Sequence, residues 1–369
     1  MSNHVDQFLR ILESTASSGA VADVSPLCEN LASDIVGDLS FGHAFNTQTQ
    51  PHNRILFDTL HEWMWLVNST MQLYMLKTYC RLRLLWDWKS TLRMMRTVKS
   101  IVDERMKKDT HAVHDFYSVS AEEFEVGKGD LVHTVMWSEA INFLIAGGTT
   151  VSGAMYPEWH DRVTEEVRSA FDSGADIVPG PQLASCKLLR ACMEEAMRCA
   201  PPVTTTPWRQ QDKYDKTGNP YEVAGHVIPK GTLVGINFYA LFHNEELYPD
   251  SYVFKPERFL DVEDGASEEE KEAKALMRKA FVPFSIGERG CAGKAMAWAE
   301  MTQTIARTLW YFDFEKAPGE AGSLGEVMRV SNDGSIVPEY KLEDIFGAIH
   351  HGPNLVFRQR EKLVRSTGN

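Results

Sequence analysis

Apolar residues recur at helical spacing through most of this chain, and that periodicity restricts the fold more than any other feature of the sequence. The spacing predicts helices over Val5 to Leu12, Ser25 to Leu39, His61 to Lys77, Thr91 to Lys107, Leu131 to Met155, Arg162 to Phe171, Leu188 to Cys199 and Ala295 to Phe312. Short strand-like runs occur between Tyr221 and Phe242, where glycine and proline separate them. We therefore expect a mainly α-helical protein with small β-sheets.

The composition is that of a globular enzyme with a large core. The chain has 369 residues, of which 43% are hydrophobic and 24% charged, and it contains no internal repeat. We expect one domain over residues 1–369. A formal net charge of −13 argues against a nucleic-acid partner, because binding phosphate requires clustered Lys and Arg. The acidic run from Asp261 to Glu272 is expected to be a solvated loop.

Cysteine usage and hydropathy bear on the compartment. The six cysteines form no C-x-x-C pair, which is typical of a reducing compartment in which disulfides are not expected. No stretch reaches the roughly 18 apolar residues that a spanning helix needs. The segment from His61 to Lys77 is rich in bulky apolar residues and is expected to be core or substrate-channel wall, with membrane contact as the alternative. We expect a soluble chain with at most peripheral membrane contact.

Cys291 lies where a glycine-rich turn meets a predicted helix. The positive end of a helix, backbone N–H groups in a turn and the nearby Arg289 all favour a thiolate. Such a thiolate can be the axial ligand of a haem iron. The alternative at this point is a buried structural cysteine beside an ordinary turn.

Residues Phe284, Gly287, Arg289, Cys291 and Gly293 match F-x-x-G-x-R-x-C-x-G, the haem-binding signature of the cytochrome P450 family, and the chain resembles that family. The resemblance implies a haem-binding loop over residues 284–293. In it, Cys291 would be the axial ligand to the iron of haem b and Arg289 would pair with a propionate. Phe284 would pack beside the sulfur, while Gly287 and Gly293 would let the backbone approach the macrocycle.

Other residues match further family positions. Glu195 and Arg198 lie on one helix face, a spacing common in surface pairs, but they also resemble the family's Glu-x-x-Arg. The resemblance implies that Arg258 completes a buried network with a structural role. It also places Arg209 where the family has a second propionate-binding residue; the alternative is an exposed arginine at the start of a strand.

The predicted helix over Leu131 to Met155 resembles the family helix that crosses the distal haem face. Thr150 matches the family's threonine, and the resemblance gives it a catalytic role in proton delivery. Thr149 stands where the family has an acid, and a threonine cannot shuttle a proton as a carboxylate does. Two adjacent glycines, Gly147 and Gly148, predict either a kink in this helix or a close approach of another group to its backbone.

Three departures from the family pattern concern missing sequence. Pro157 follows Met155 so closely that a segment of the family helix is absent, no W-x-x-x-R occurs, and the chain begins late relative to the family. We therefore expect a cytochrome P450 fold that lacks its N-terminal part.

The resemblance implies a haem-thiolate monooxygenase that hydroxylates a small organic substrate with dioxygen and electrons from an NADPH-dependent reductase. Asp34 to Gly42 resembles the fungal branch that acts in secondary metabolism. The resemblance implies a location in the cytoplasm or on the cytoplasmic face of the endoplasmic reticulum. Two alternatives remain: a truncated, catalytically inactive relative, and a haem-thiolate isomerase or dehydratase that needs no reductase.

Overall fold

The structure is a computed structural model that describes residues 1–76 apart from 44, scattered positions between 78 and 107, and residues 159–360 apart from 213, 215–218, 263–264, 331–333 and 335. For these residues the prediction of a mainly helical chain with small sheets is confirmed. Most of the predicted helix over residues 91–107, and all of the one over residues 131–155, lie outside them.

The other predicted helices are present, with bounds that differ from the predicted ones at some ends. The longer helices are α1 (Ser2–Ser18), α2 (Val24–Phe41), α3 (Ile55–Gln72), α8 (His160–Ala170), α10 (Lys187–Cys199), α12 (Glu268–Ala280) and α13 (Lys294–Tyr311). Short α-helical turns form α9 (Pro181–Ala184) and α11 (Phe238–Phe242). Short 3-10 turns include η5 (Pro256–Phe259) and η6 (Gly287–Arg289).

Helix α1 shows how local sequence determines an element. Val5, Phe8, Leu9 and Leu12 are buried and stand at i, i+3, i+4 and i+7, so they form one stripe toward the core. The helix ends at Gly19, whose φ of 66° lies in the left-handed region that glycine tolerates.

The described strands form small antiparallel sheets. One sheet has three strands in the order β1-β11-β6, and the others pair β2 with β5, β3 with β4, β7 with β8, and β9 with β10. The strands are β1 (Val21–Asp23), β2 (Arg209–Gln210), β3 (Tyr221–Val223), β4 (His226–Ile228), β5 (Leu233–Val234), β6 (Phe312–Lys316), β7 (Glu326–Val330), β8 (Ile336–Tyr340), β9 (Glu343–Ile345), β10 (Gly347–Ile349) and β11 (Asn354–Gln359). The strand-like runs predicted after Tyr221 correspond to β3, β4 and β5.

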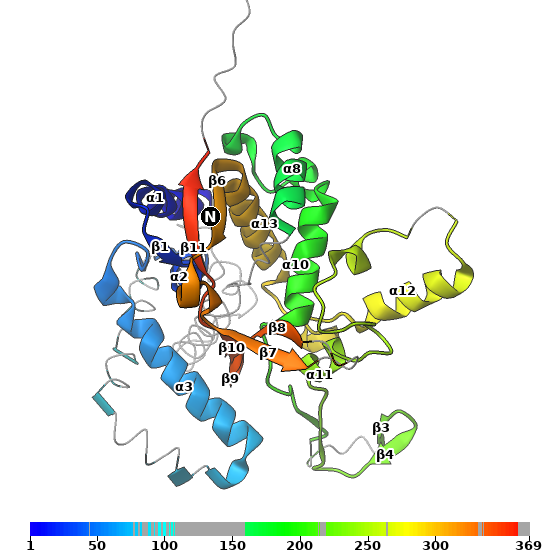
Figure 1. Cartoon of the computed structure of the whole chain (residues 1–369). Coiled ribbons are helices and arrows are strands. Elements are labelled where there is room, and N and C mark those ends of the chain that lie inside the picture. The colour runs from blue at the N-terminus through cyan, green and yellow to red at the C-terminus, as the bar shows by residue number, and fades with distance from the viewer. Residues whose placement is uncertain are drawn as a thin grey trace, which may run out of the picture.

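Helices pack on both sides of the three-stranded sheet. In Figure 1, α1 and α2 lie on one side of strand β11, and α8, α10 and α13 lie on the other. The main hydrophobic core draws its buried side chains from these helices together with β6 and β11. A smaller core joins α10 and α11 to the segment that leads to α12. Within the described ranges, no helix is both long and apolar enough to cross a membrane.

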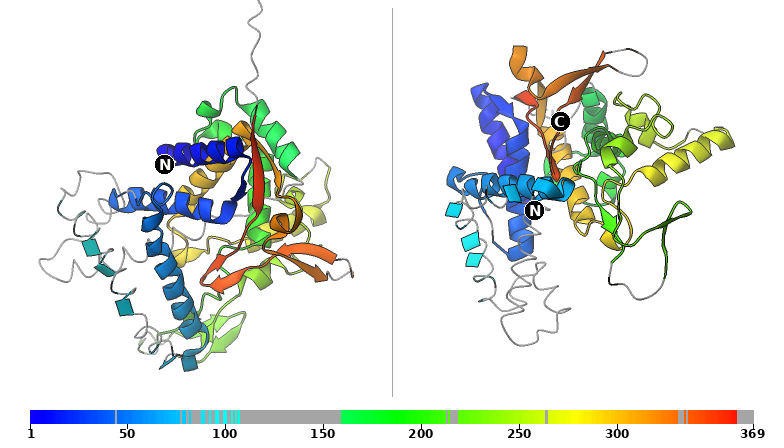
Figure 2. Two further views of the ribbon diagram at one scale, coloured as in Figure 1. Left: turned by 60° about the vertical axis from the view of Figure 1, so that its left-hand side comes forward. Right: turned by 90° about the horizontal axis from the view of Figure 1, so that it is seen from below.

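The acidic run is not a loop throughout, so that prediction was wrong for its second half. Residues Glu268 to Ala280 form α12, which extends away from the rest of the chain in Figure 1 and in the right panel of Figure 2. The Ser267 side chain accepts from the Glu270 backbone N–H, and Glu270 accepts from the Ser267 backbone N–H. This capping box offsets the unsatisfied N–H groups of the first turn, where the helix dipole also favours acidic residues.

Candidate functional site

The loop over residues 284–293 is folded by its own backbone. The Cys291 N–H donates to the Phe284 carbonyl at 2.8 Å, which closes the loop, and Gly290 donates to Gly287 at 2.9 Å. Gly287 has a φ of 70°, which explains why glycine suits the turn. Helix α13 begins directly after Gly293, so Cys291 lies at the N-terminal end of that helix.

Cys291 is the most accessible of the cysteines that the structure describes. Of the five cysteines that the structure describes, Cys291 is exposed, and the other four are partly or fully buried. Burial raises the pKa of the Cys28 and Cys192 thiols to about 12, which disfavours their thiolates. A Cβ added at Gly293 would lie 3.8 Å from Cys291 Sγ, so glycine keeps the space beside the sulfur open.

Phe284 anchors the start of the loop to two helices. Its ring lies 6.1 Å from the Trp298 ring of α13, and the Arg190 guanidinium of α10 lies 4.3 Å from the same indole. Phe284 also packs against the main core. The backbone that carries Cys291 is therefore attached to the packed interior at its first residue.

The two arginines assigned to haem propionates are both exposed. Arg289 is in the short turn η6, two residues before Cys291, whereas Arg209 begins strand β2. Arg209 Nη1 donates to the carbonyls of Pro207 at 3.3 Å and Trp208 at 3.1 Å. The hydrogen bonds that the Arg209 side chain makes with described residues are thus to its own segment, and none of them joins it to the loop.

Glu195, Arg198 and Arg258 meet in a buried network. Arg198 binds Glu195 in a bidentate arrangement at 2.8 and 2.9 Å, and both side chains are completely buried. Arg258 Nε lies 3.3 Å from Glu195 Oε1, and Arg198 also donates to the Phe242 carbonyl at 2.8 Å. The network therefore joins α10 to α11 and to η5, and its role in this geometry is to hold these elements together.

Thr149 and Thr150 lie outside the described residues. The distal side of the site is therefore represented by the sequence alone.

The loop fits a haem. A flat apolar macrocycle held by a thiolate needs an accessible sulfur, glycine beside it and apolar surface nearby. Cys291 Sγ is accessible, Gly287 and Gly293 keep the backbone free of side chains, and Ile286 is 72% exposed although apolar. Arg289 adds a cation that could pair with a propionate.

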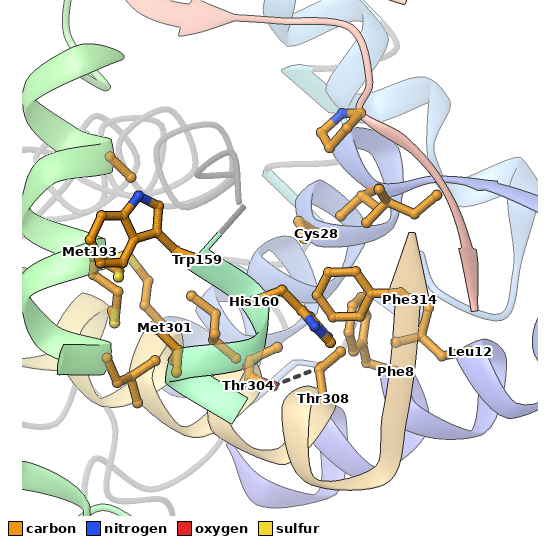
Figure 3. Close-up of a pocket in the computed structure, with 18 of the residues that line it drawn as sticks. Phe8, Leu12, Cys28, Trp159, His160, Met193, Met301, Thr304, Thr308 and Phe314 are labelled. Carbon is orange, nitrogen blue, oxygen red and sulfur yellow. Dashed lines mark hydrogen bonds between the residues drawn. The ribbon is translucent and has the colours of Figure 1, made fainter. Parts of the chain in front are cut away.

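A cavity of about 120 Å³ lies along α13 (Figure 3), and no residue of the loop over residues 284–293 lines it. Helices α1, α2, α8 and α10 also line it, and none of the predicted site residues does. Its walls are mainly apolar, with Trp159 at one end and Phe314 toward the other in Figure 3. The predicted chemistry therefore involves none of the residues that line this cavity.

Glu300 lines that cavity and was missed by the sequence analysis. Its side chain is 1% exposed, and neither carboxylate oxygen has a hydrogen-bond partner among the described residues. Burial raises the pKa of this carboxyl from 4.5 to about 8. A possible signal was its place in the predicted helix, four residues before Thr304 and eight before Thr308, which also line the cavity.

The comparisons with known proteins agree with the geometry. A profile described as "Cytochrome P450" matches residues 1–325. A cytochrome P450 monooxygenase of Gibberella zeae is 32% identical over 352 residues, which are 91% of this chain and 77% of the relative.

Two further relatives carry similar names. The cytochrome P450 monooxygenase poxM of Penicillium oxalicum is 31% identical, over 94% of this chain and 65% of its own length. The monooxygenase fscF of Fusarium equiseti is 32% identical, over 96% of this chain and 69% of its own length. A crystal structure of a cytochrome P450 matches with a TM-score of 0.69 at 20% identity, over 97% of this chain and 73% of that one. The similarity to that structure concerns the fold.

Proposed function

Because the chain belongs to the cytochrome P450 family, we propose that it is a haem-thiolate monooxygenase that oxidises a small organic substrate. Dioxygen is the oxidant and an NADPH-dependent reductase supplies the electrons. The similarity to fungal monooxygenases supports a substrate from secondary metabolism. Haem, when bound, supplies reductive activation of dioxygen.

One observation carries the proposal most directly. Cys291 is exposed at the N-terminal end of α13, in a loop that its own N–H closes onto Phe284. The other cysteines that the structure describes are shielded, so Cys291 is the residue among them that is suited to ligate a metal.

The chain's own residues bind and orient the cofactor in this proposal. Cys291 Sγ would hold the haem iron, and Arg289 and Arg209 would pair with the propionates. For Arg209 this requires exchanging its backbone contacts for a stronger charge-assisted pair. Thr150, with Thr149 beside it in the sequence, would order a water that delivers protons when haem is bound.

A second candidate is a haem-thiolate isomerase or dehydratase that acts on an already oxidised substrate. Thr149 favours it, because it replaces the acid that the monooxygenase pattern has at this position. Product formation that does not require NADPH and reductase would support this candidate, whereas strict dependence on both would support the monooxygenase.

The test compares the wild-type protein with Cys291→Ala and Cys192→Ala. Each is reduced, exposed to carbon monoxide and examined for the strongly red-shifted Soret band that a thiolate ligand produces. We expect the band in the wild type and in Cys192→Ala, which removes a partly buried cysteine of α10, and its loss in Cys291→Ala.

Failure of the wild type to take up haem would contradict the proposal and leave the inactive relative as the better description. A band that persists in Cys291→Ala would assign the ligand to another residue.

A further inference from the structure

The cavity beside α13 is large enough for a small organic molecule. Its volume of about 120 Å³ is close to that of an engineered protein cavity of about 150 Å³ that holds benzene. Most of the side chains around it are apolar, with Phe8 and Leu12 of α1 toward one end and Met193 of α10 toward the other (Figure 3). A molecule that occupies this cavity therefore needs a compact apolar body.

An acidic side chain lies on this mainly apolar wall. Glu300 is 1% exposed, and neither of its carboxylate oxygens has a hydrogen-bond partner among the described residues. A buried carboxylate without a partner is costly, because it has lost its contacts with water and gained nothing in exchange. Such a group calls for an explanation, and one explanation is a ligand that supplies the missing hydrogen bonds.

A hydroxyl on the next turn of α13 lines the same cavity. Thr304 is four residues after Glu300, a spacing that places both side chains on one helix face. Thr304 is 8% exposed, and its Oγ1 also lacks a hydrogen-bond partner within the described ranges. Thr308, one turn further, differs because its hydroxyl donates to the Thr304 carbonyl at 2.8 Å (Figure 3). This face of α13 thus offers two carboxylate oxygens and one hydroxyl oxygen as unpaired acceptors.

The charges around the cavity favour a cationic ligand. The other ionisable side chains on the described part of its wall are Cys28, His160 and Cys192. Burial raises the pKa of both thiols to about 12, so they are neutral near pH 8. The Met1 amino group lowers the pKa of Glu300, but by less than burial raises it. His160 Nδ1 lies 3.1 Å from the Asp161 carboxylate.

We propose that this cavity binds a small primary amine with an apolar body of about four to six carbons, and that Glu300 and Thr304 hold its ammonium group. An ammonium has three N–H donors and no acceptor, which matches the three unpaired acceptors on α13. Hydrogen bonds between an ammonium and a carboxylate are about twice as strong as bonds between neutral groups. The site shares no residue with the Cys291 loop, so the inference goes beyond the proposed function.

Binding of the amine should depend on the ionisation of Glu300. Burial raises the pKa of this carboxyl to about 8, so about half of it is ionised at pH 8 and about one part in a hundred at pH 6. An ammonium pairs with the ionised form, and below pH 8 its binding must release the Glu300 proton. The affinity for the amine should therefore rise about fiftyfold from pH 6 to pH 8.

The test compares isobutylamine with two matched probes. Isobutanol has the same apolar body without the charge, and ammonium chloride has the charge without the body. The protein is loaded with haem, reduced and saturated with carbon monoxide, so that the amine cannot bind to the iron. At constant ionic strength, the shift of the urea midpoint with probe concentration gives each dissociation constant. At pH 8 we expect isobutylamine to bind at least about tenfold more tightly than either other probe.

Three variants assign the binding to the cavity, and each shift is measured from the variant's own midpoint. Glu300→Gln keeps the shape of the side chain without its charge, so it should weaken isobutylamine about ten- to a hundredfold and abolish the pH dependence. Thr304→Val removes one acceptor and should weaken isobutylamine about two- to tenfold while the pH dependence remains. Glu272→Gln, an exposed position on α12, should behave as the wild type.

Equal affinities for isobutylamine and isobutanol would overturn the inference, because the carboxylate would then take no part in recognition. Unchanged binding of isobutylamine in Glu300→Gln would overturn it as well, since the amine would bind elsewhere. So would a urea midpoint that moves with none of the probes. If the chain takes up no haem, the same titrations on the protein as isolated decide in the same way, because the cavity does not include the Cys291 loop.

Discussion

Replacing Glu300 by glutamine should remove a pH-dependent destabilisation that originates in the cavity beside α13. The carboxyl is buried, has no hydrogen-bond partner among the described residues, and has its pKa raised to about 8. In the unfolded chain the same group loses its proton near its ordinary pKa of 4.5. Between these two values the folded state therefore holds more protons than the unfolded state, and raising the pH favours unfolding.

The size of the destabilisation follows from the difference between the pH of the experiment and the ordinary pKa of the carboxyl. One pKa unit corresponds to about 1.4 kcal/mol, so at pH 7 keeping Glu300 protonated costs about 3 kcal/mol of folding free energy. At pH 5 the cost falls below about 1 kcal/mol. Glutamine has nearly the same shape and does not titrate, so Glu300→Gln should be more stable than the wild type by these amounts.

The assay is urea unfolding at pH 5, 6, 7 and 8, followed by circular dichroism, with the haem content of the preparations matched. The difference in unfolding free energy between Glu300→Gln and the wild type should grow with pH up to about 8. Glu272→Gln, an exposed position on α12, is the matched control and should follow the wild type. Parallel pH profiles for the wild type and Glu300→Gln would refute the reasoning, because they would mean that Glu300 is ionised in the folded protein.

Two further predictions concern the buried network and the cysteines. Arg198→Gln leaves the completely buried Glu195 carboxylate without its bidentate partner and should lower the free energy of unfolding by about 3–5 kcal/mol. Lys187 lies on the same helix as Arg198, and Lys187→Gln breaks its exposed pair with Asp261. This variant should leave the urea midpoint almost unchanged, and equal losses in the two variants would contradict the argument. In haem-free protein at pH 8, iodoacetamide should label Cys291 well before Cys28 or Cys192, whose pKa values near 12 leave about one thiol in ten thousand ionised. Mass spectrometry of the labelled peptides measures the order, and equally fast labelling of Cys28 would show that it is not buried.

Local sequence patterns were enough to predict most of the helices and the turn over residues 284–293. The buried stripe of α1 follows from i, i+3, i+4 spacing, and the contact between Glu195 and Arg198 follows from i, i+3 spacing on α10. The pattern from Phe284 to Gly293 lies within ten consecutive residues, so its turn is determined by neighbours in the chain. The start of α12 also had a local signal, the capping-box residues Ser267 and Glu270. The acidic composition of the run nevertheless favoured the prediction of a loop.

Contacts between distant segments were decided by the tertiary structure alone. Asp344 joins Asn68 and Thr205 only because β9, α3 and the segment before β2 pack together, and no spacing in the sequence relates positions so far apart. The raised pKa of Glu300 likewise depends on burial by several elements, whereas its helical position is a local property. Sequence by itself thus determined the local elements and the turn over residues 284–293, because both depend on neighbouring residues. Packing decided which polar groups are buried, paired or strained, because desolvation depends on everything that surrounds a side chain.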